Sequence, residues 1–511
     1  MMDSAMPAAA AKFFVALALV AGTSPARADE PAEANDSAAD DAPAPATPAA
    51  EPARTSEPAP TKEAAIERPV IALPGASTAG AQPPATSWFA REPLALRIGE
   101  GDKTWSLTFY GFIEADFITD STRSYDERIS SSLVARSDTY EGHHGQTQFS
   151  IRNTRLGLQF KSPVTGGVSP SAVIETDFYG AKPDPSTTTT PEKDYYDAAS
   201  LRVRHAYLLL ENAYVDVLAG QTYNVFGWQN FRSTQFRLSH NFGAWTGPVT
   251  LTLAASVARP AQRDSSVPDA NVGLRLNINR WQGVITTNAN SGSLSQPMFL
   301  QVSAVGRQYK VDSFTPPPTQ NSNSASAWGV SIDALLPVIP ANDANDRGNR
   351  LTLTGSFVTG TGIGDLISAN GGAAFPTLPN PAQANPPPLY TPDIDNGLVS
   401  FDVQGVLHTI DWRAVKVGLQ YYLPPSGRLF LTANYTQAHS TNMAKLFPKG
   451  GAEIELLGRV ADTTQQGDVN LYWDATPAVR FGLTGAYTKV RYLDGNEPHN
   501  LRGAGLVQYA F

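Results

Sequence analysis

From Trp105 to Phe511 the sequence repeats short segments in which apolar and polar side chains alternate, separated by Gly, Pro, Asn, Asp or Ser. In V-T-L-T-L-A-A-S-V, for example, Val249, Leu251, Leu253 and Val257 fall on one face of an extended strand. The same alternation occurs at 105–117, 271–279, 350–357 and 480–489. The polar faces carry mostly small, uncharged or basic residues, which suits strands between a wet lumen and lipid. The sequence therefore predicts an all-β chain that forms a transmembrane antiparallel β-barrel.

The length of this region bounds the number of strands. Residues 104–511 accommodate about 16 strands, and at most about 18, at roughly 25 residues for each strand and its connection. Long loops are expected at 120–145, 180–198, 311–325, 361–397 and 440–465. Aromatic residues near strand ends predict girdles at the two membrane interfaces. They are Trp281, Trp328, Trp412, Tyr421, Tyr422, Trp473 and Tyr492.

The sequence ends in L-V-Q-Y-A-F, which places Val507, Tyr509 and Phe511 on one face of a strand. A last strand that ends on an aromatic residue resembles the assembly signal of bacterial outer-membrane barrels, so Phe511 is expected to serve as that signal. Such a strand must close the barrel, because an unpaired strand edge is too costly in lipid. The expected location is the bacterial outer membrane, and the expected partners include membrane lipid and the barrel-assembly machinery.

The start of the chain has a different composition. Lys12, the apolar run 13–21 and Ala26-Arg27-Ala28 predict a signal peptide at 1–28 that is cleaved after Ala28. Residues 29–86 are rich in Pro and Ala and carry 10 acidic residues against 3 basic ones. This composition predicts a disordered periplasmic linker, either a plain tether or a segment that contacts the cell wall. The barrel domain is expected at 87–511.

Several classes of function find no support in the sequence. The chain has 0 Cys, which excludes disulfides and thiolate chemistry. Its 7 His residues show no metal-ligand spacing, and His143-His144 falls in an expected loop. The net charge of −9 and the lack of a basic cluster argue against nucleic-acid binding. We expect no catalytic residues, metal or cofactor, and no enzymatic activity.

Inward-facing charges are the features of a pore that carry selectivity. Arg152 and Arg155 lie in F-S-I-R-N-T-R-L-G-L-Q-F, where the apolar parity switches, so a β-bulge or bend near Asn153-Thr154 is expected to turn both inward. Without the bulge, one Arg would face lipid at a cost of roughly 2–4 kcal/mol.

Other arginines are also expected on the inner wall. Arg202 and Arg204 share a face, opposite Leu201, Val203, Tyr207 and Leu209, and Arg275 is inward by alternation. Arg237 and Arg480 are weaker candidates. These arginines either contact anionic solutes or pair with acidic residues and brace the wall. The expected acidic partners are Glu114, Asp116, Glu175 and Asp177.

The stretch Gly220–Trp228, G-Q-T-Y-N-V-F-G-W, precedes an irregular segment. It is expected either to fold inward as a constriction loop or to stay an outer loop.

Several blocks together resemble the DcaP-like family of outer-membrane porins. They are Tyr110–Phe117, Gly145–Phe160, Ile174–Gly180, Leu201–Leu210 and Leu218–Phe226. The resemblance covers roughly the first third of the barrel, and it implies a 16-stranded homotrimeric porin that passes small organic anions such as dicarboxylates. Members can carry a helical, coiled-coil-like N-terminal segment, whereas 29–86 shows no heptads, which puts that segment's role in oligomers in doubt.

The sequence thus predicts an outer-membrane porin for passive diffusion of small hydrophilic solutes, favouring anions. Two alternatives remain open. One is a structural barrel that tethers the membrane to the cell wall through 29–86, and the other is an outer-membrane barrel hydrolase.

Overall fold

The computed structural model describes residues 94–123, 134–180, 200–228, 231–243, 247–261, 265–287, 290–312, 322–343, 345–367, 397–401, 406–446 and 461–511. The expected signal peptide, its cleavage site at Ala28 and the 29–86 linker lie outside these residues and stay predictions.

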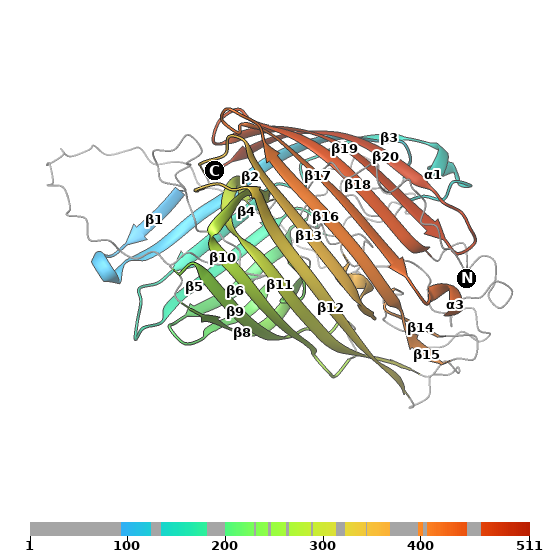
Figure 1. The fold of residues 1–511 in the computed structure, drawn as a ribbon, viewed down its shortest axis with the longest axis horizontal. Helices are drawn as coiled ribbons and strands as arrows, with labels where there is room; N and C mark the ends of the chain where they lie inside the picture. The colour runs from blue at the N-terminus through green and yellow to red at the C-terminus, as the bar shows by residue number, and fades with distance from the viewer. Residues whose placement is uncertain are drawn as a thin grey trace, which may run out of the picture.

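The described residues form mainly β-strands (Figure 1). The strands are β1 (Leu94–Ile98), β2 (Trp105–Asp120), β3 (Gln146–Ser150), β4 (Arg155–Lys161), β5 (Ser169–Asp177), β6 (Arg202–Glu211), β7 (Asp216–Tyr223), β8 (Arg232–Phe242), β9 (Val249–Ala258), β10 (Asp269–Thr287), β11 (Asn290–Asp312), β12 (Ser322–Ile339), β13 (Arg350–Thr361), β14 (Val399–Phe401), β15 (Leu407–Thr409), β16 (Asp411–Tyr422), β17 (Leu429–Ser440), β18 (Ala461–Asp474), β19 (Val479–Tyr492) and β20 (His499–Ala510). The short helical elements are η2 (Gly101–Lys103), α1 (Tyr140–His143), η4 (Gly364–Leu366) and α3 (Met443–Leu446).

One antiparallel sheet closes on itself to form the barrel. Neighbouring strands around the barrel follow chain order, except that β13 pairs with β16 because β14 and β15 form a separate two-stranded sheet. β20 pairs with β2, with Ile113 opposite Tyr509. β3 and β4 both pair with β2 and share one position in the wall, and β1 pairs only with the start of β2. The predicted 16-stranded antiparallel barrel is confirmed. At the seam, Phe511 N donates to Gly111 O at 3.1 Å and the Phe511 ring stacks on Phe109.

The barrel has an apolar outer wall and a polar inner wall. On β9, Val249 and Val257 are 47% and 49% exposed, whereas Thr250 and Thr252 are fully buried. A continuous apolar outer face suits contact with lipid, and only a closed barrel satisfies every strand's backbone groups there. This surface places the protein in the bacterial outer membrane, as predicted.

Short turns join the strands at one end and long connections at the other. β1 and the C-terminus lie at the turn end, whereas α1, α3 and the β14–β15 pair lie at the loop end (Figure 1). In outer-membrane barrels the short turns face the periplasm. No helix among the described residues is long and apolar enough to cross a membrane.

The predicted aromatic girdles need correction. Trp328 and Trp473 are exposed on the outer wall. Trp412 and Tyr422 are instead buried inside, because they share the inward parity of β16 with Gln420. The Trp412 indole nitrogen donates to Gly397 O at 2.8 Å and so serves loop packing rather than the interface.

Apolar loop residues enter the loop end of the lumen. Phe226, Ile363, Leu366 and Met443 come from three different connections, and they pack in one buried cluster with wall residues that include Trp412. Part of the barrel interior is therefore filled by the chain itself, although a barrel of this width is wide enough to hold an aqueous channel.

Candidate functional site

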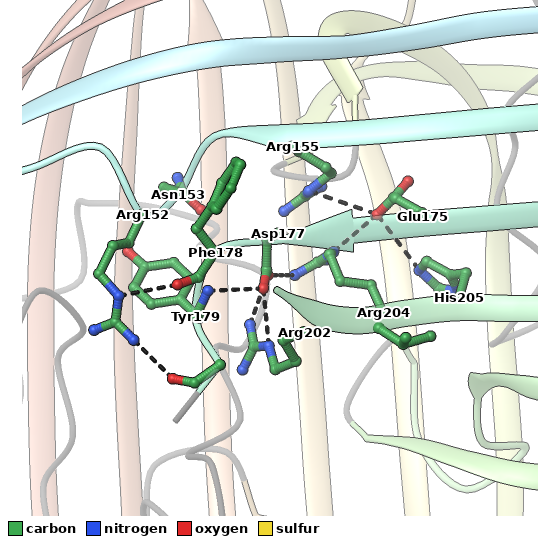
Figure 2. Close-up of polar contacts among 12 residues, drawn as sticks. Arg152, Asn153, Arg155, Glu175, Asp177, Phe178, Tyr179, Arg202, Arg204 and His205 are labelled. Atoms are coloured by element: carbon green, nitrogen blue, oxygen red, sulfur yellow. Dashed lines mark hydrogen bonds and ion pairs between the residues drawn. The ribbon is translucent and has the colours of Figure 1, made fainter. Parts of the chain in front are cut away.

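A row of charged side chains crosses the inner faces of β4, β5 and β6 (Figure 2). Cross-strand register places Arg155 opposite Asp177, and Asp177 opposite Arg202. We name this row the arginine ladder; it comprises Arg155, Glu175, Asp177, Arg202 and Arg204.

The ladder is a continuous chain of ion pairs. Arg204 Nε donates to Glu175 Oε1 at 2.8 Å, and Arg204 Nη1 donates to Asp177 Oδ2 at 3.0 Å. Arg202 grips the same Asp177 with Nε and Nη2, at 3.0 and 2.7 Å. Arg155 Nε lies 3.5 Å from Glu175 Oε1. Arginine forks on carboxylates fix both partners in orientation, so the ladder braces this part of the wall.

A β-bulge in β6 explains how Arg204 joins the ladder. Glu175 lies opposite His205 and Thr176 lies opposite Val203, so Arg204 is the extra residue. Arg204 and His205 therefore both face inward, and the parity of β6 changes after them. The prediction that Tyr207 shares the outer face is wrong for this reason: Tyr207 is buried, and Leu208 is exposed instead.

Aromatic and hydroxyl groups complete the surroundings of Glu175. Tyr110 OH donates to Glu175 Oε2 at 3.1 Å. His205 is buried, and its Nδ1 lies 3.0 Å from Thr222 Oγ1. The centroids of the His205 and Tyr223 rings are 5.2 Å apart. The ladder is thus embedded in a buried polar layer that extends to β7.

Arg152 anchors a loop rather than joining the ladder. The chain leaves strand geometry between β3 and β4, at residues 151–154, which is where the sequence shows its switch in parity. Arg152 Nε donates to Phe178 O at 2.9 Å, and Nη2 donates to Gly180 O at 2.8 Å. Its guanidinium also lies over the Tyr179 ring (Figure 2).

The four acidic residues named from the sequence divide into two groups. Glu175 and Asp177 pair with the ladder arginines. Glu114, on β2, instead accepts hydrogen bonds from Asn153 Nδ2 and from Gln508 Nε2, the latter at 2.6 Å. Asp116 has the same inward parity and is half-buried.

The other predicted arginines lie apart from the ladder. β7, β8 and β9 separate Arg275, on β10, from β6. Arg275 is fully buried, donates from Nε to Asn277 Oδ1 at 2.9 Å, and lies 3.7 Å over the Phe299 ring. Arg237 is buried on β8, and Arg480 pairs with Asp474 at 2.6 Å. The arginines therefore form separate groups on the inner wall instead of one continuous strip.

Several basic residues on the inner side were missed from the sequence: Arg307, Arg347 and Arg502 are buried there, and Arg232 and Lys416 are half-buried. Arg232 lies 5.5 Å from the Tyr223 ring. Lys416 is half-buried on β16, between the exposed outer residues Val415 and Val417. The alternation in A-V-K-V-G-L could have identified Lys416, whereas Arg232 begins its strand, where alternation gives no guidance.

The segment Asn224–Trp228 after β7 folds into the barrel. Gly227 N donates to Ser303 Oγ of β11 at 2.8 Å. The Phe226 side chain joins the buried cluster at the loop end, and Trp228 packs edge-on against Phe299 at 5.2 Å. Of the two expected outcomes for Gly220–Trp228, the described residues of the loop show the inward one, whereas Gly220–Tyr223 belong to β7.

Among the described residues, no group of three or more His, Asp or Glu side chains is arranged to hold a metal ion.

No family model and no curated protein matches the sequence. Among solved structures, the outer-membrane channel DcaP of Acinetobacter baumannii is similar with a TM-score of 0.54 at 17% identity, over 80% of this chain and 97% of that one. An anion-selective porin from Comamonas acidovorans has a TM-score of 0.43 at 9% identity, over 80% of this chain and 100% of that one. The trimer form of OmpT from Vibrio cholerae has a TM-score of 0.42 at 10% identity, over 80% of this chain and 99% of that one. The last two likenesses are too weak to support an argument. The first shows that this chain shares the barrel fold of an outer-membrane channel.

Proposed function

We propose that the protein is an outer-membrane porin through which small hydrophilic solutes diffuse passively, with a preference for organic anions. The observation that carries this proposal is a local excess of positive charge on the inner wall around β4–β8, inside a closed barrel with an apolar outer wall. In the ladder, three arginines face two carboxylates, and Arg152 and Arg232 lie beside it.

The ladder acts through its field rather than through free donors. The carboxylates of Glu175 and Asp177 already pair with the guanidinium groups of Arg204 and Arg202. Direct bidentate capture of an anionic solute by these arginines would therefore break ion pairs. An unbalanced positive charge in a low-dielectric wall still raises the local concentration of anions. Arg202, Arg232 and Lys416 are half-buried basic groups of the inner wall, and they are placed to meet a hydrated solute.

Dicarboxylates are the solutes that the resemblance to DcaP-like porins suggests, and a homotrimer is the assembly it suggests. Both belong to the proposal. The cell-wall contact through 29–86 stays a prediction of the sequence.

Single-channel recording of the purified protein in a planar bilayer under a KCl gradient tests the proposal. We expect stepwise conductance, an anion-selective reversal potential and current block by a dicarboxylate. A folded barrel without conductance would overturn the porin function and favour the structural alternative. Conductance with cation selectivity would retain the porin and remove the anion preference.

A further inference from the structure

β10 and β11 form a hairpin that extends beyond the neighbouring strands of the barrel wall. β10 has 19 residues and β11 has 23, whereas the neighbouring β9 has 10. β9 pairs with β10 only as far as Ile278, and β12 pairs with β11 only as far as Phe299. Beyond these points β10 and β11 pair with each other, from Gln282 opposite Pro297 onward. We name the described residues of this extension, 282–287 and 290–297, the inner hairpin.

The inner hairpin leaves the wall instead of extending it. β12 continues along β13, with Leu336 opposite Leu353 and Pro337 opposite Thr352, after β11 has separated from it. The register of β10 and β11 shifts between Ile278 and Gln282, which is the irregularity that permits the bend.

The hairpin then runs across the inner side of the barrel. Thr352 Oγ1 of β13 donates to Val284 O at 3.1 Å. Thr286 N donates to Gln420 Oε1 of β16 at 2.7 Å, and Gln420 Nε2 donates back to Thr286 O at 3.0 Å. Arg480 Nη2 of β19 reaches Thr286 Oγ1 at 3.4 Å. Gln420 and Arg480 have inward parity, because Val417, three residues before Gln420, and Phe481, next to Arg480, are exposed outside.

Apolar packing holds the hairpin on both sides. Val284 packs with Tyr422 and Phe430 in one fully buried cluster. Ile285 and Leu294 pack with Phe299 and Leu335, and Trp228 from the loop end packs against them. Two adjacent residues, Val284 and Ile285, are thus both fully buried, which a strand in a lipid-facing wall cannot achieve.

The seat of the hairpin is itself braced. Arg480 Nε donates to Asp474 Oδ1 at 2.6 Å, and Arg347 Nη2 donates to Asp474 Oδ2 at 2.7 Å. The guanidinium of Arg347 lies over Tyr422, and that of Arg480 lies over Phe430. Breaking this set would leave buried charges unpaired, so the seat is rigid.

We propose that the inner hairpin is a fixed constriction at the periplasmic end of the pore, and that solutes pass through the part of the opening that its contacts with β13, β16, β17 and β19 leave free. Further along β17–β19 from these contacts, the inner face carries half-buried amide and hydroxyl groups, from Asn434, Thr436, Gln466 and Thr484. This inference rests on the proposed porin function, but the position of the hairpin can be tested without any channel activity.

Cross-linking tests the position. The chain has 0 Cys, so an engineered pair is the sole source of thiols. We expect a short thiol cross-linker to join Thr286→Cys to Gln420→Cys in the folded barrel, closing a loop between residues 134 apart and changing the mobility of the denatured chain. The matched control joins Thr286→Cys with Val415→Cys, which faces outward on the same strand and should not cross-link. Failure of the first pair, or equal cross-linking of both, would overturn the inner position.

Channel recording tests the constriction. Replacing Gly283–Gln296 by Asn-Gly keeps the Gln282–Pro297 pair and supplies a two-residue hairpin turn. We expect a single-channel conductance roughly twofold higher or more, because the narrowest section controls conduction. The cross-linked Thr286→Cys/Gln420→Cys protein, with its full-length hairpin, should keep the parent conductance.

The outcomes separate the inference from the function. Parent-like conductance of the shortened, folded variant would overturn the constriction while leaving the porin intact. Absence of conductance in the parent would overturn the porin function and the constriction together, whereas the cross-link would still report the hairpin's position.

If the shortened chain fails to fold, Gln420→Ala removes both hydrogen bonds to Thr286, and we expect larger current fluctuations than in the parent. Unchanged fluctuations would count against the constriction.

Discussion

Arg204 bonds to Glu175 and Asp177 at once, and its Nε lies 2.8 Å from Glu175 Oε1, because a bulge turns it inward beside His205. This contact makes Glu175 the centre of the ladder, since Arg155 and Tyr110 also approach its carboxylate. The ladder therefore has a structural role that is separable from its effect on passing ions.

Removing the carboxylate charge of Glu175 should destabilise the barrel. In Glu175→Gln the buried Arg155 and Arg204 lose a counter-charge, and breaking a buried ion pair on one side costs about 3–5 kcal/mol. We expect a matching fall in the free energy of unfolding, measured by urea denaturation in lipid vesicles. Asp138→Asn is the control, because that carboxylate is 57% exposed and its pair with Arg136 is worth under about 1 kcal/mol. Equal stability of the two variants would show that the ladder does not brace the wall.

Lys416 should contribute to anion preference. Lys416→Gln removes a charge from a half-buried inner position. We expect the anion-to-cation permeability ratio to fall on the order of twofold, because one charge across a hydrated lumen is worth under about 1 kcal/mol. Reversal potentials under a KCl gradient measure this ratio.

Arg413→Gln is the matched control for Lys416→Gln. It removes the same charge from an exposed position with outward parity on the same strand. An equal change in both variants would indicate a general surface effect rather than a lumen effect.

The fold could be predicted from the sequence because side-chain alternation directly reports which face of each strand meets lipid. Val249 to Val257 shows the pattern, and the structure places its apolar members outside. The membership of Glu175, Asp177, Arg202 and Arg204 in one inner group followed from the same alternation on neighbouring strands.

The remaining features depend on where the chain departs from alternation. The bulge at Arg204 moves Tyr207 inside, and no residue type in R-V-R-H-A-Y marks it. The inner hairpin extends a regular strand past its neighbours, so its length is visible only once β9 and β12 are known to end earlier. The adjacent apolar pair Val284-Ile285 is the one local sign that this segment is buried on both sides.

Arg136 links two loops at the loop end and should make their contact pH-dependent. Its Nη2 lies 2.6 Å from Asp494 Oδ2 and 2.8 Å from Asp138 Oδ2. The hydrogen bond from Arg136 lowers the pKa of Asp138. Partial burial raises the pKa of Asp494, but the hydrogen bonds from Arg136 and from the backbone N–H of Asn496, together with the charge of Arg136, outweigh it, and the net shift is downward.

A carboxyl whose pKa is lowered on folding stabilises the fold above its unfolded pKa, near 3.9, and loses this contribution as the pH falls through the folded value. We therefore expect the loop contact to hold from neutral pH to about pH 4 and to weaken below it. Hydrogen exchange of residues 134–140 between pH 7 and pH 3, corrected for the intrinsic exchange rate, measures this. Asp494→Asn should reduce the pH dependence, and an unchanged profile in that variant would show that Arg136–Asp494 does not hold the loops together.

Asp365 should hold the inward segment that contains η4. Arg307 Nη1 donates to Asp365 Oδ1 at 2.6 Å and also to Gly362 O, while Nη2 donates to Asp269 Oδ2. In Asp365→Ala, Arg307 keeps Asp269, so we expect a loss of about 1–3 kcal/mol rather than unfolding. Because Ile363 and Leu366 pack inside the lumen, their release should also speed proteolytic cleavage within 363–367.

Asp346→Ala is the matched control, since its ion pair with Arg350 lies in a partly exposed turn at the opposite end of the barrel. Faster cleavage in both variants would mean that general loosening, and not loss of the Arg307 contact, frees this segment.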